Sequence, residues 1–321
     1  MRRRLHALAA ALLSLPMALA VAPSAHAADP TGMTSGFYTD PNSSAKQWVA
    51  ANPADGRAPA INSSLANTPM ARWFGSWSGT IGTATGAYVG AADHADKLPI
   101  LVAYNIYNRD TCGGHSSGGA ASPSAYATWI AQFAGGIAAR PAVVVLEPDA
   151  IADYGCLNPT QIRERQGMIN GAVAEFGRQA PNTWVYLDAG NPGWVNAATM
   201  AQRLHEAGLR QAHGFSLNIS NYFTTAQNTA YGNAVNSELG ARYGYTKPFV
   251  VDTSRNGNGS SGEWCNAAGR RIGTPTQLGG GAEMLLWIKA PGESDGNCGV
   301  GAGSTAGQFL PEAAYKMIYG Y

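Results

Sequence analysis

Two carboxylates separated by a proline end an apolar run in the middle of the chain. Residues 143–146 read Val-Val-Val-Leu and are followed at once by Glu147, Pro148 and Asp149. A run of this length predicts a strand buried on both faces, which is typical of a parallel sheet covered by helices. In that architecture the carboxyl ends of the strands carry the chemistry. Glu147 and Asp149 are therefore candidates for acid–base work, although such a turn also serves simply to end a strand.

Similar groups recur along the chain. The same interval of 39 residues separates Asp110 from Asp149 and Asp149 from Asp188, so we expect the three aspartates at equivalent strand ends. Glycoside hydrolysis requires one carboxyl group held protonated and a second one ionised, and crowding of like charges raises one of the two pKa values. The full set of candidates at predicted strand ends is Tyr104, Arg109, Asp110, Glu147, Asp149, Asp188, Asn218, Asn221, Asp252, Lys289, Glu293 and Asp295.

Three tryptophans in predicted loops fit the same chemistry, because an indole stacks on the apolar face of a sugar ring. They are Trp73, Trp194 and Trp264. Each of them could instead pack within a loop or the core. An ion pair of purely structural importance is likewise the interpretation we prefer for Asp252, and in part for Asp188.

Alternating strands and helices must position these groups. We expect strands over 98–104, 142–146, 183–187, 214–217, 248–251 and 283–288, and helices over 122–140, 160–179, 196–207 and 227–243. Ser122 and Pro123 form a helix-starting pair, and Gly208 provides a helix stop. Repeated strand–helix units form either a closed barrel or an open doubly wound sheet. We favour the barrel, because the glycine-rich segment 112–119 lacks the spacing of a dinucleotide-binding turn.

The first 27 residues have the pattern of a secretory signal peptide. Three arginines, an apolar run over 5–21 and the small-x-small site Ala25-His26-Ala27 follow one another. We expect a signal peptide over 1–27 and one catalytic domain over 28–321. Because the apolar run is short, the mature protein is expected to be soluble, secreted and extracellular, without a membrane span.

Composition excludes several classes of function. The formal net charge is +1 and only 13% of residues are charged, which is poorly suited to nucleic acid and favours an uncharged polymer. An even number of cysteines in an exported protein predicts two disulfides, in any of three pairings. Neither a metal nor a cofactor is expected, because the cysteines and histidines lack metal-binding spacing. The cysteines are Cys112, Cys156, Cys265 and Cys298, and the histidines outside the signal are His94, His115, His205 and His213.

Six ordered motifs, which span nearly the whole mature chain, resemble those of glycoside hydrolase family 6, the inverting cellulases. They are Tyr104-Asn105 with Arg109-Asp110 and Cys112, Leu146-Glu147-Pro148-Asp149, Asp188-Ala189-Gly190 with Trp194, Asn218 to Tyr222, Trp264-Cys265-Asn266, and Trp287-Ile288-Lys289 leading to Gly292-Glu293-Ser294-Asp295-Gly296. The resemblance implies an α/β fold, a distorted TIM-like barrel of parallel strands in a single domain. Its active-site loops would form a cleft or tunnel over β-1,4-glucan.

Matching motifs also imply catalytic roles. Asp149 resembles the general acid that protonates the leaving oxygen, and Asp110 would raise the pKa of Asp149 and help to pass on a proton from the attacking water. Asp295 is similar to the proposed general base, and Ser117 to a serine that relays the proton through water instead. Glu147 becomes a supporting residue. Tyr104 would press on the distorted sugar, while Asp188 and Arg109 would hold the charge network.

Substrate binding and disulfide pairing follow from the same resemblance. The family pairs the first two cysteines with each other and the last two with each other. Two departures concern Thr111, inserted before Cys112, and Asn191, which stands where a histidine is common. The residues implied in sugar binding are Trp73, Trp194, Asn191, Asn221, Trp264, Lys289 and Glu293.

Loop length predicts how the polymer is cut. In the family that the chain resembles, processive members roof the site with long loops before the Trp-Cys motif and after the final aspartate. The corresponding segments 252–264 and 295–298 are short here, so the resemblance implies an open cleft and internal cleavage. The resulting hypothesis is a secreted, monomeric endo-β-1,4-glucanase that acts on cellulose or another β-1,4-glucan with inversion. The alternatives are a cellobiohydrolase of the same family and a non-catalytic β-glucan-binding protein. A Ser-His-Asp hydrolase is disfavoured, because His205 and His213 have no obvious serine partner.

Overall fold

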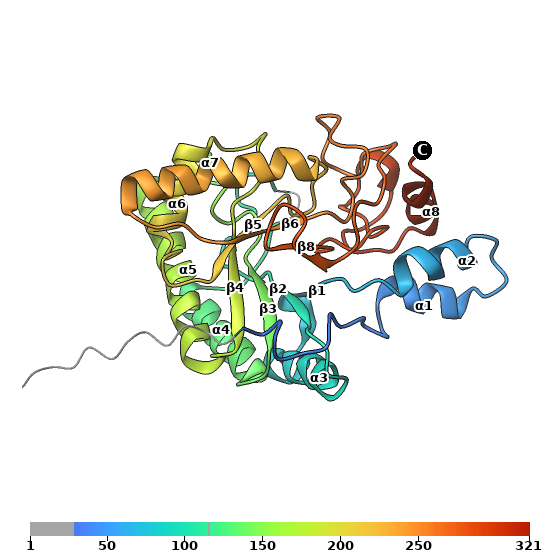
Figure 1. The fold of residues 1–321 in the computed structure, drawn as a ribbon, viewed down its shortest axis with the longest axis horizontal. Helices are drawn as coiled ribbons and strands as arrows, with labels where there is room; N and C mark the ends of the chain where they lie inside the picture. The colour runs from blue at the N-terminus through green and yellow to red at the C-terminus, as the bar shows by residue number, and fades with distance from the viewer. Residues whose placement is uncertain (1–28, 115) are drawn as a thin grey trace, which may run out of the picture.

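Eight strands form one curled sheet in a computed structural model that describes residues 29–114 and 116–321 (Figure 1). The predicted signal peptide and His115 therefore lie outside the described residues. The strand order is β1-β2-β3-β4-β5-β6-β8-β7, and every pairing is parallel except that of β7 with β8. The strands are β1 (Arg72–Phe74), β2 (Ile100–Ala103), β3 (Ala142–Leu146), β4 (Thr183–Asp188), β5 (Gly214–Leu217), β6 (Phe249–Asp252), β7 (Gln277–Leu278) and β8 (Met284–Leu286).

The sheet curls until β1 approaches β8, which confirms the predicted distorted barrel. The backbone N–H of Ala71 donates to the carbonyl of Trp287 at 2.8 Å, and the indole N–H of Trp73 donates to the carbonyl of Ile288 at 2.8 Å. In a fully closed barrel, a ladder of backbone hydrogen bonds would join β1 to β8. Within the part of the chain that the structure describes, β1 and β8 are not paired in this way, and these two hydrogen bonds connect them instead. The cleft described below opens beside this irregular seam.

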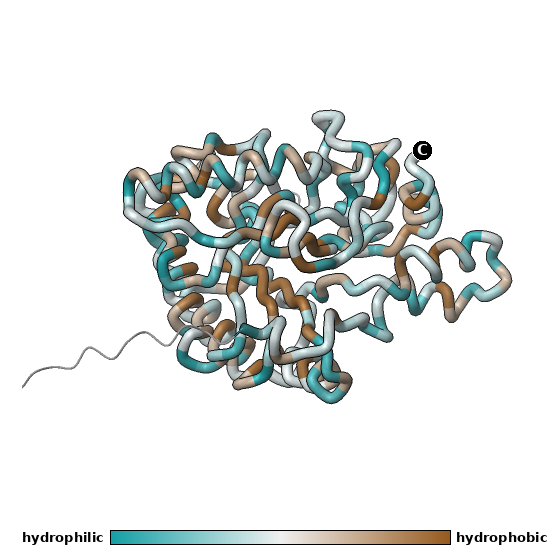
Figure 2. The backbone as a smooth tube through the Cα atoms, in the orientation of Figure 1, coloured by the Kyte–Doolittle hydropathy of each residue, from teal (hydrophilic) through white to brown (hydrophobic). Residues whose placement is uncertain are grey.

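Both faces of the strands are buried, as the apolar runs predict. In β3, Val143 and Val145 belong to the core inside the barrel, while Val144 and Leu146 belong to the core between sheet and helices. A strand that alternates between two apolar cores has no polar face, which is typical of parallel sheets. The central strands accordingly appear brown in Figure 2, while outer turns of the helices carry teal.

Five helices cover the outside of the barrel, and three others gather at one end (Figure 1). The hydroxyl of Ser122 accepts from the N–H of Ala125 at 3.1 Å, so the predicted helix start is confirmed. Gly208 has a φ of +94° just after a helix, where a stop is predicted. The outer helices are α3 (Ile81–His94), α4 (Pro123–Ile137), α5 (Pro159–Gln179), α6 (Ala197–Glu206) and α7 (Thr225–Tyr243).

The remaining helices build a separate small core around the fully buried Trp287, which follows β8. They are α1 (Ser44–Ala51), α2 (Ala58–Ile61) and α8 (Pro311–Tyr319), together with a π-helical turn over Asn62–Ala66. Short 3-10 turns lie at Ser76–Ser78 and Gly299–Gly301. Among the helices that the structure describes, none is long and apolar enough to cross a membrane.

Candidate active site

A cleft of about 1100 Å³ opens at the carboxyl ends of the strands. Of the predicted catalytic and sugar-binding residues, only Asp188 is absent from its lining, because this side chain is fully buried. The cleft brings together Tyr104, Arg109, Asp110, Ser117, Asp149 and Asp295 with Trp73, Asn191, Trp194, Asn221, Trp264, Lys289 and Glu293.

Unusual backbone conformations gather at these strand ends. Positive φ angles occur at Asp110 (52°), Glu147 (50°), Asp149 (71°), Asn218 (68°) and Ser220 (56°). A side chain with a Cβ disfavours this region, at a cost of roughly 1 kcal/mol or more per residue, and such strain concentrates at functional sites. The strained turns therefore lie at the same end of the sheet as the carboxylates of the cleft.

The equal sequence intervals do not place the three aspartates at equivalent strand positions, contrary to our expectation. Asp188 is the last residue of β4, Asp149 follows β3 in a tight turn, and Asp110 lies far along the loop after β2. The loops differ in length, so an equal interval in the sequence is coincidental. All three still lie at the same end of the sheet, because β2, β3 and β4 run parallel.

Asp149 lies directly against Asp188. The backbone N–H of Asp149 donates to Oδ2 of Asp188 at 2.8 Å. Burial, followed by the charges of Asp188 and Asp110, raises the pKa of Asp149 well above its usual value. Burial also raises the pKa of Asp188 to about 6. A carboxyl group crowded in this way keeps its proton to a higher pH than an ordinary aspartic acid does, which suits a proton donor.

Asp110 is held by a serine of its own loop. The N–H of Ser116 donates to Oδ2 of Asp110 at 2.5 Å, and the Ser116 hydroxyl lies 3.3 Å from the same oxygen. The phenol of Tyr104 shares a hydrogen bond with that hydroxyl at 2.7 Å. Sequence reasoning selected the neighbouring Ser117, which also lines the cleft. Two adjacent serines in a glycine-rich loop cannot be distinguished without the backbone path.

The loop segment 114–118 also matches the Gly-x-Ser-x-Gly pattern of serine hydrolases. In those enzymes the serine lies in a sharp turn between a strand and a helix. Here the segment lies within the long loop between β2 and α4, and the Ser116 hydroxyl contacts Tyr104 and Asp110. Acid–base chemistry between carboxylates therefore fits this loop better than a serine nucleophile does.

Arg109 fastens the same loop to β2. Its guanidinium donates to the carbonyls of Tyr104 at 2.7 Å and Ser116 at 2.9 Å, and it lies 4.3 Å from the centre of the Tyr104 ring. The resemblance predicts a place for Arg109 in the charge network, whereas these hydrogen bonds go to carbonyl oxygens. Its contribution to the site is therefore the position of the loop that carries Asp110.

Two buried carboxylates support the backbone behind the cleft. Glu147 accepts from the N–H groups of Asn105 and Ile106 at 2.9 Å each, and burial raises its pKa to about 7. Asp252 accepts from four backbone N–H groups, those of Ser220, Ser254, Ile288 and Lys289. The ion pair expected for Asp252 is therefore wrong within the described chain, where backbone donors satisfy this carboxylate.

Asp295 is locked in a buried ion pair that the sequence reasoning missed. Arg255 donates to both of its oxygens, at 2.8 and 3.0 Å, and Lys289 lies 3.4 Å away. Although burial favours the neutral acid, these two cations hold the pKa of Asp295 below its usual value. The one available signal was that Arg255 closely follows a buried strand, β6, at the rim of the barrel. Asp295 is therefore ionised and weakly basic.

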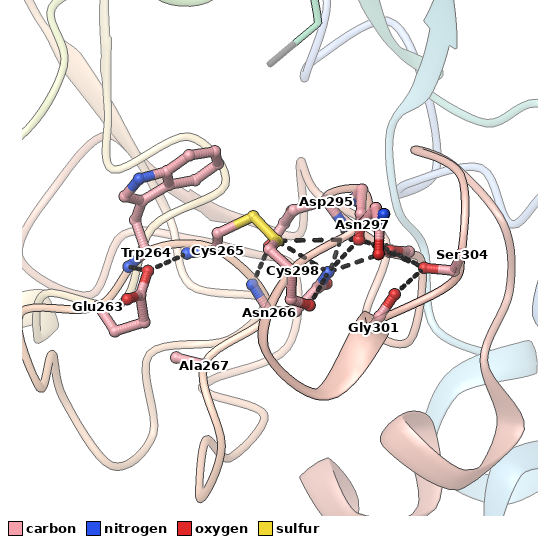
Figure 3. The surroundings of a disulfide bond; sticks show 12 residues. Glu263, Trp264, Cys265, Asn266, Ala267, Asp295, Asn297, Cys298, Gly301 and Ser304 are labelled. Carbon is pink, nitrogen blue, oxygen red and sulfur yellow. Dashed lines mark hydrogen bonds between the residues drawn. A yellow bond between two sulfur atoms is a disulfide. The ribbon is translucent and has the colours of Figure 1, made fainter.

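Both predicted disulfides are present, Cys112–Cys156 and Cys265–Cys298. Figure 3 shows the second one between the loop of Trp264 and the loop of Asp295. Asn266 tightens this junction, because its N–H donates to Oδ2 of Asp295 at 2.9 Å and its Oδ1 accepts from the N–H of Asp295 at 2.8 Å (Figure 3). The loop that carries Trp264 and the carboxylate of Asp295 are thus fixed relative to each other.

Aromatic rings form the walls of the cleft. Trp194 and Trp264 lie in loops, as predicted, and expose 44% and 38% of their surface. Trp73 belongs to strand β1 and not to a loop, contrary to our expectation. Its ring lies edge-on to the ring of Tyr104, with 5.1 Å between the two ring centres. A three-residue strand that begins with an arginine gives too short a pattern to be recognised from the sequence.

Polar groups complete the walls. Glu293 accepts from the hydroxyl of Ser44 at 2.7 Å, and burial raises its pKa. Lys289 donates to the carbonyl of Ser294 at 3.2 Å, and Oδ1 of Asn191 accepts from the N–H of Gly193 at 3.0 Å. Across residues 29–114 and 116–321, no three His, Cys, Asp or Glu side chains are grouped so that they could hold a metal ion.

Comparisons with known proteins identify a matching family and similar sequences. Residues 33–319 match the model of the family described as glycosyl hydrolases family 6. The chain is 80% identical to endoglucanase 1 of Streptomyces halstedii over 321 residues, which is the full length of both. It is 45% identical to endoglucanase 1 of Streptomyces sp. (strain KSM-9), over 85% of this chain and 75% of that protein.

A solved structure extends the likeness to the fold. The endoglucanase Cel6 from Mycobacterium tuberculosis, in complex with methyl-cellobiosyl-4-deoxy-4-thio-β-D-cellobioside, matches with a TM-score of 0.82 and 38% sequence identity. The match covers 91% of this chain and 99% of that one.

Proposed function

The chain belongs to glycosyl hydrolases family 6, and from this membership and the geometry of the cleft we propose that it is an endo-β-1,4-glucanase acting on cellulose or a related β-1,4-glucan. The observation that carries the proposal is the hydrogen bond from the backbone N–H of Asp149, which lines the cleft, to the buried carboxylate of Asp188 behind it. Burial and two neighbouring carboxylates make the anionic form of Asp149 costly. Asp149 thus holds its proton to a higher pH than an ordinary aspartic acid, as a general acid must.

In the proposed mechanism, Asp149 protonates the glycosidic oxygen as the bond to the anomeric carbon breaks. Positive charge then develops on the sugar ring, which the negative charges of Asp188 and Asp110 stabilise. A water molecule attacks from the opposite face of the ring, so the anomeric configuration inverts. The phenol of Tyr104 stays neutral, because burial raises its pKa, and its hydroxyl faces the same region of the cleft.

We propose that Asp110 accepts the proton of the attacking water. Ser116 would orient the groups through which this proton passes. Ser116 contacts both Asp110 and Tyr104, and its hydroxyl can donate and accept at once. Asp295, the general base suggested by the resemblance, is a weaker candidate, because Arg255 and Lys289 hold its proton affinity down. Its charge serves better to stabilise the transition state and to orient Lys289.

The substrate would lie along the aromatic walls. Trp73, Trp194 and Trp264 provide stacking faces, and Lys289 and Glu293 offer partners for sugar hydroxyls. Asn191 and Asn221 add amide groups to the same lining. Two strands, β2 and β3, lie between β1 with Trp73 and β4 before Trp194, so the polymer would cross the catalytic carboxylates between these walls.

Internal cleavage is the mode that the relatives support, because the 80% identical protein is an endoglucanase, whereas a probable exoglucanase of Podospora anserina is 30% identical over 71% of this chain. A non-catalytic β-glucan-binding protein is disfavoured, because Asp110, Asp149 and Asp295 line one cleft and the buried Asp188 lies directly behind Asp149. Export through the segment 1–27, a mature domain over 28–321 and action as a monomer complete the proposal. They rest on the sequence pattern alone.

Cleavage mode can be tested on soluble carboxymethylcellulose by recording viscosity and reducing ends in the same reaction. An endoglucanase lowers the viscosity steeply while it releases few reducing ends. A slow fall in viscosity with abundant cellobiose would indicate exo action instead. If the protein bound the polymer and neither quantity changed, the non-catalytic alternative would be correct.

A further inference from the structure

A fourth tryptophan of the cleft has no assigned role. Trp77 lies in the 3-10 turn Ser76–Ser78 between β1 and α3, and it lines the cleft. It exposes 57% of its surface, more than either Trp194 or Trp264. Full burial of a large apolar side chain stabilises a protein by roughly 1.5 to 3 kcal/mol, and an indole exposed to water loses much of this free energy. An exposed indole at the rim of a binding cleft therefore calls for an explanation.

The neighbours of Trp77 hold its ring in one orientation. The ring lies so close to Gly75 that a Cβ on that residue would come within 2.4 Å of the indole carbons. The guanidinium of Arg109 lies 5.5 Å from the ring centre. Arg109 also lies against the ring of Tyr104 and donates to two carbonyls of the catalytic loop. The indole is therefore supported from the protein side and open toward the cleft.

Sugar is the ligand that this surface fits. A pyranose presents an apolar face of C–H groups, and a rigid indole next to polar groups binds such a face with little loss of side-chain entropy. If the ring merely shielded Arg109 from water, it would be covered to a similar degree itself. More than half of its surface is exposed instead.

We propose that Trp77 forms a further sugar-binding subsite at the β1 side of the cleft, where its indole stacks on one glucosyl unit of the substrate chain. This inference rests on the proposed function. Trp73 lies on β1 and Trp77 lies in the turn that follows this strand, so the two indoles line the same wall of the cleft. Trp77 touches substrate at a distance from the bond that breaks, so it contributes to affinity for longer chains.

The test compares Trp77→Ala and Trp77→Phe with a matched control, Tyr319→Ala. Tyr319 is a similarly exposed aromatic residue, at 52%, and lies on α8 outside the cleft lining. Binding of cellotetraose and cellohexaose is measured by calorimetry in proteins that also carry Asp149→Asn, so that the sugars are not hydrolysed. Reducing-end assays with active proteins give kcat and KM on carboxymethylcellulose.

We expect Trp77→Ala to weaken binding of the longer oligosaccharide by about 3- to 10-fold, the loss of one stacking contact. KM on the polymer rises by a similar factor, kcat changes less than 2-fold, and Trp77→Phe retains most of the affinity. Tyr319→Ala leaves both constants unchanged. Equal melting temperatures of the variants and the wild type show that the exposed ring is not needed for folding.

Two outcomes would overturn the inference. Affinity and KM that stay within 2-fold of the wild type would show that no sugar contacts the ring. A fall in kcat with a shifted pH profile and unchanged affinity would show that Trp77 acts only through Arg109. Failure of the proposed function is a separate result, because the wild type itself would then not hydrolyse carboxymethylcellulose.

Discussion

Removal of Arg255 offers a quantitative test of the buried charge network around Asp295. The side chains of Arg255 and Asp295 expose only 1% and 4% of their surface, and they form a bidentate ion pair. In Arg255→Met, the Asp295 carboxylate stays buried with Lys289 at 3.4 Å as its one remaining cation. Loss of one partner from such a pair costs about 3 to 5 kcal/mol, because a buried charge is left unpaired.

The expected change in melting temperature is a decrease of roughly 6 to 15 °C, since a chain of this size loses about 2 to 3 °C per kcal/mol. The double variant Arg255→Met with Asp295→Asn buries no unpaired ion. Its loss should therefore be smaller than the sum of the two single losses by about 2 kcal/mol or more. Arg178→Met is the matched control, because Arg178 pairs with Glu175 on the surface, where ion pairs contribute little.

The same ion pair predicts a pH dependence with a definite sign. The folded-state pKa of Asp295 lies below its ordinary value of 3.8, so the stabilisation is fully present above about pH 3.8. It is lost as the pH falls through the lowered folded-state pKa. The difference in free energy of unfolding between wild type and Arg255→Met, measured in urea, should therefore narrow in strong acid. A Tm within 1 °C of the wild type, or fully additive losses in the double variant, would refute the reasoning.

Three further predictions follow from the carboxylates and the disulfides. Asp188→Asn removes a charge beside Asp149 and thereby lowers the pKa of Asp149, so the alkaline limb of the pH profile of kcat/KM should move to lower pH; an unmoved limb would mean that the two groups are not coupled. Burial raises the pKa of Glu147 to about 7, so the wild type loses stability as the pH rises from about 4.5 to 7 and this buried carboxyl group ionises. Glu147→Gln has no group that ionises here. Its free energy of unfolding minus that of the wild type should therefore increase over this range, by up to about 3 kcal/mol. A difference in unfolding free energy between Glu147→Gln and the wild type that does not change with pH would contradict this prediction. Replacement of both Cys265 and Cys298 by serine opens a crosslink between residues 33 apart and should cost about 3 to 4 kcal/mol in urea unfolding, with a higher KM; unchanged stability would exclude a structural disulfide.

Long apolar runs made most of the barrel predictable from the sequence. The strand over 142–146 has the predicted bounds, because a run of five apolar residues, rich in β-branched valine and too short for a helix, favours a strand buried on both faces. Helix α3 and the two-residue strand β7 were not predicted. Strand β1 and helices α1, α2 and α8 were not predicted either. Their residues pack against Trp287 and the barrel seam, so their structure depends on tertiary contacts that no local pattern encodes.

The site was predictable as a set of residues and less so as a set of contacts. The motifs identified the residues that line the cleft, because carboxylates and aromatic rings at strand ends are conspicuous. They could not show that Ser116 holds Asp110, or that Arg255 neutralises Asp295. Both contacts depend on the backbone path of loops with positive φ angles, which the sequence does not specify.

The central claim, that Asp149 is the general acid, is tested most directly by the activity of Asp149→Ala on two substrates. We predict that hydrolysis of carboxymethylcellulose, whose sugar leaving group needs a proton, falls about 100- to 10,000-fold. Hydrolysis of a dinitrophenyl cello-oligosaccharide, whose leaving group needs no proton, should remain within about 10-fold of the wild type. Equal losses on the two substrates, or full activity on the polymer, would contradict the assignment.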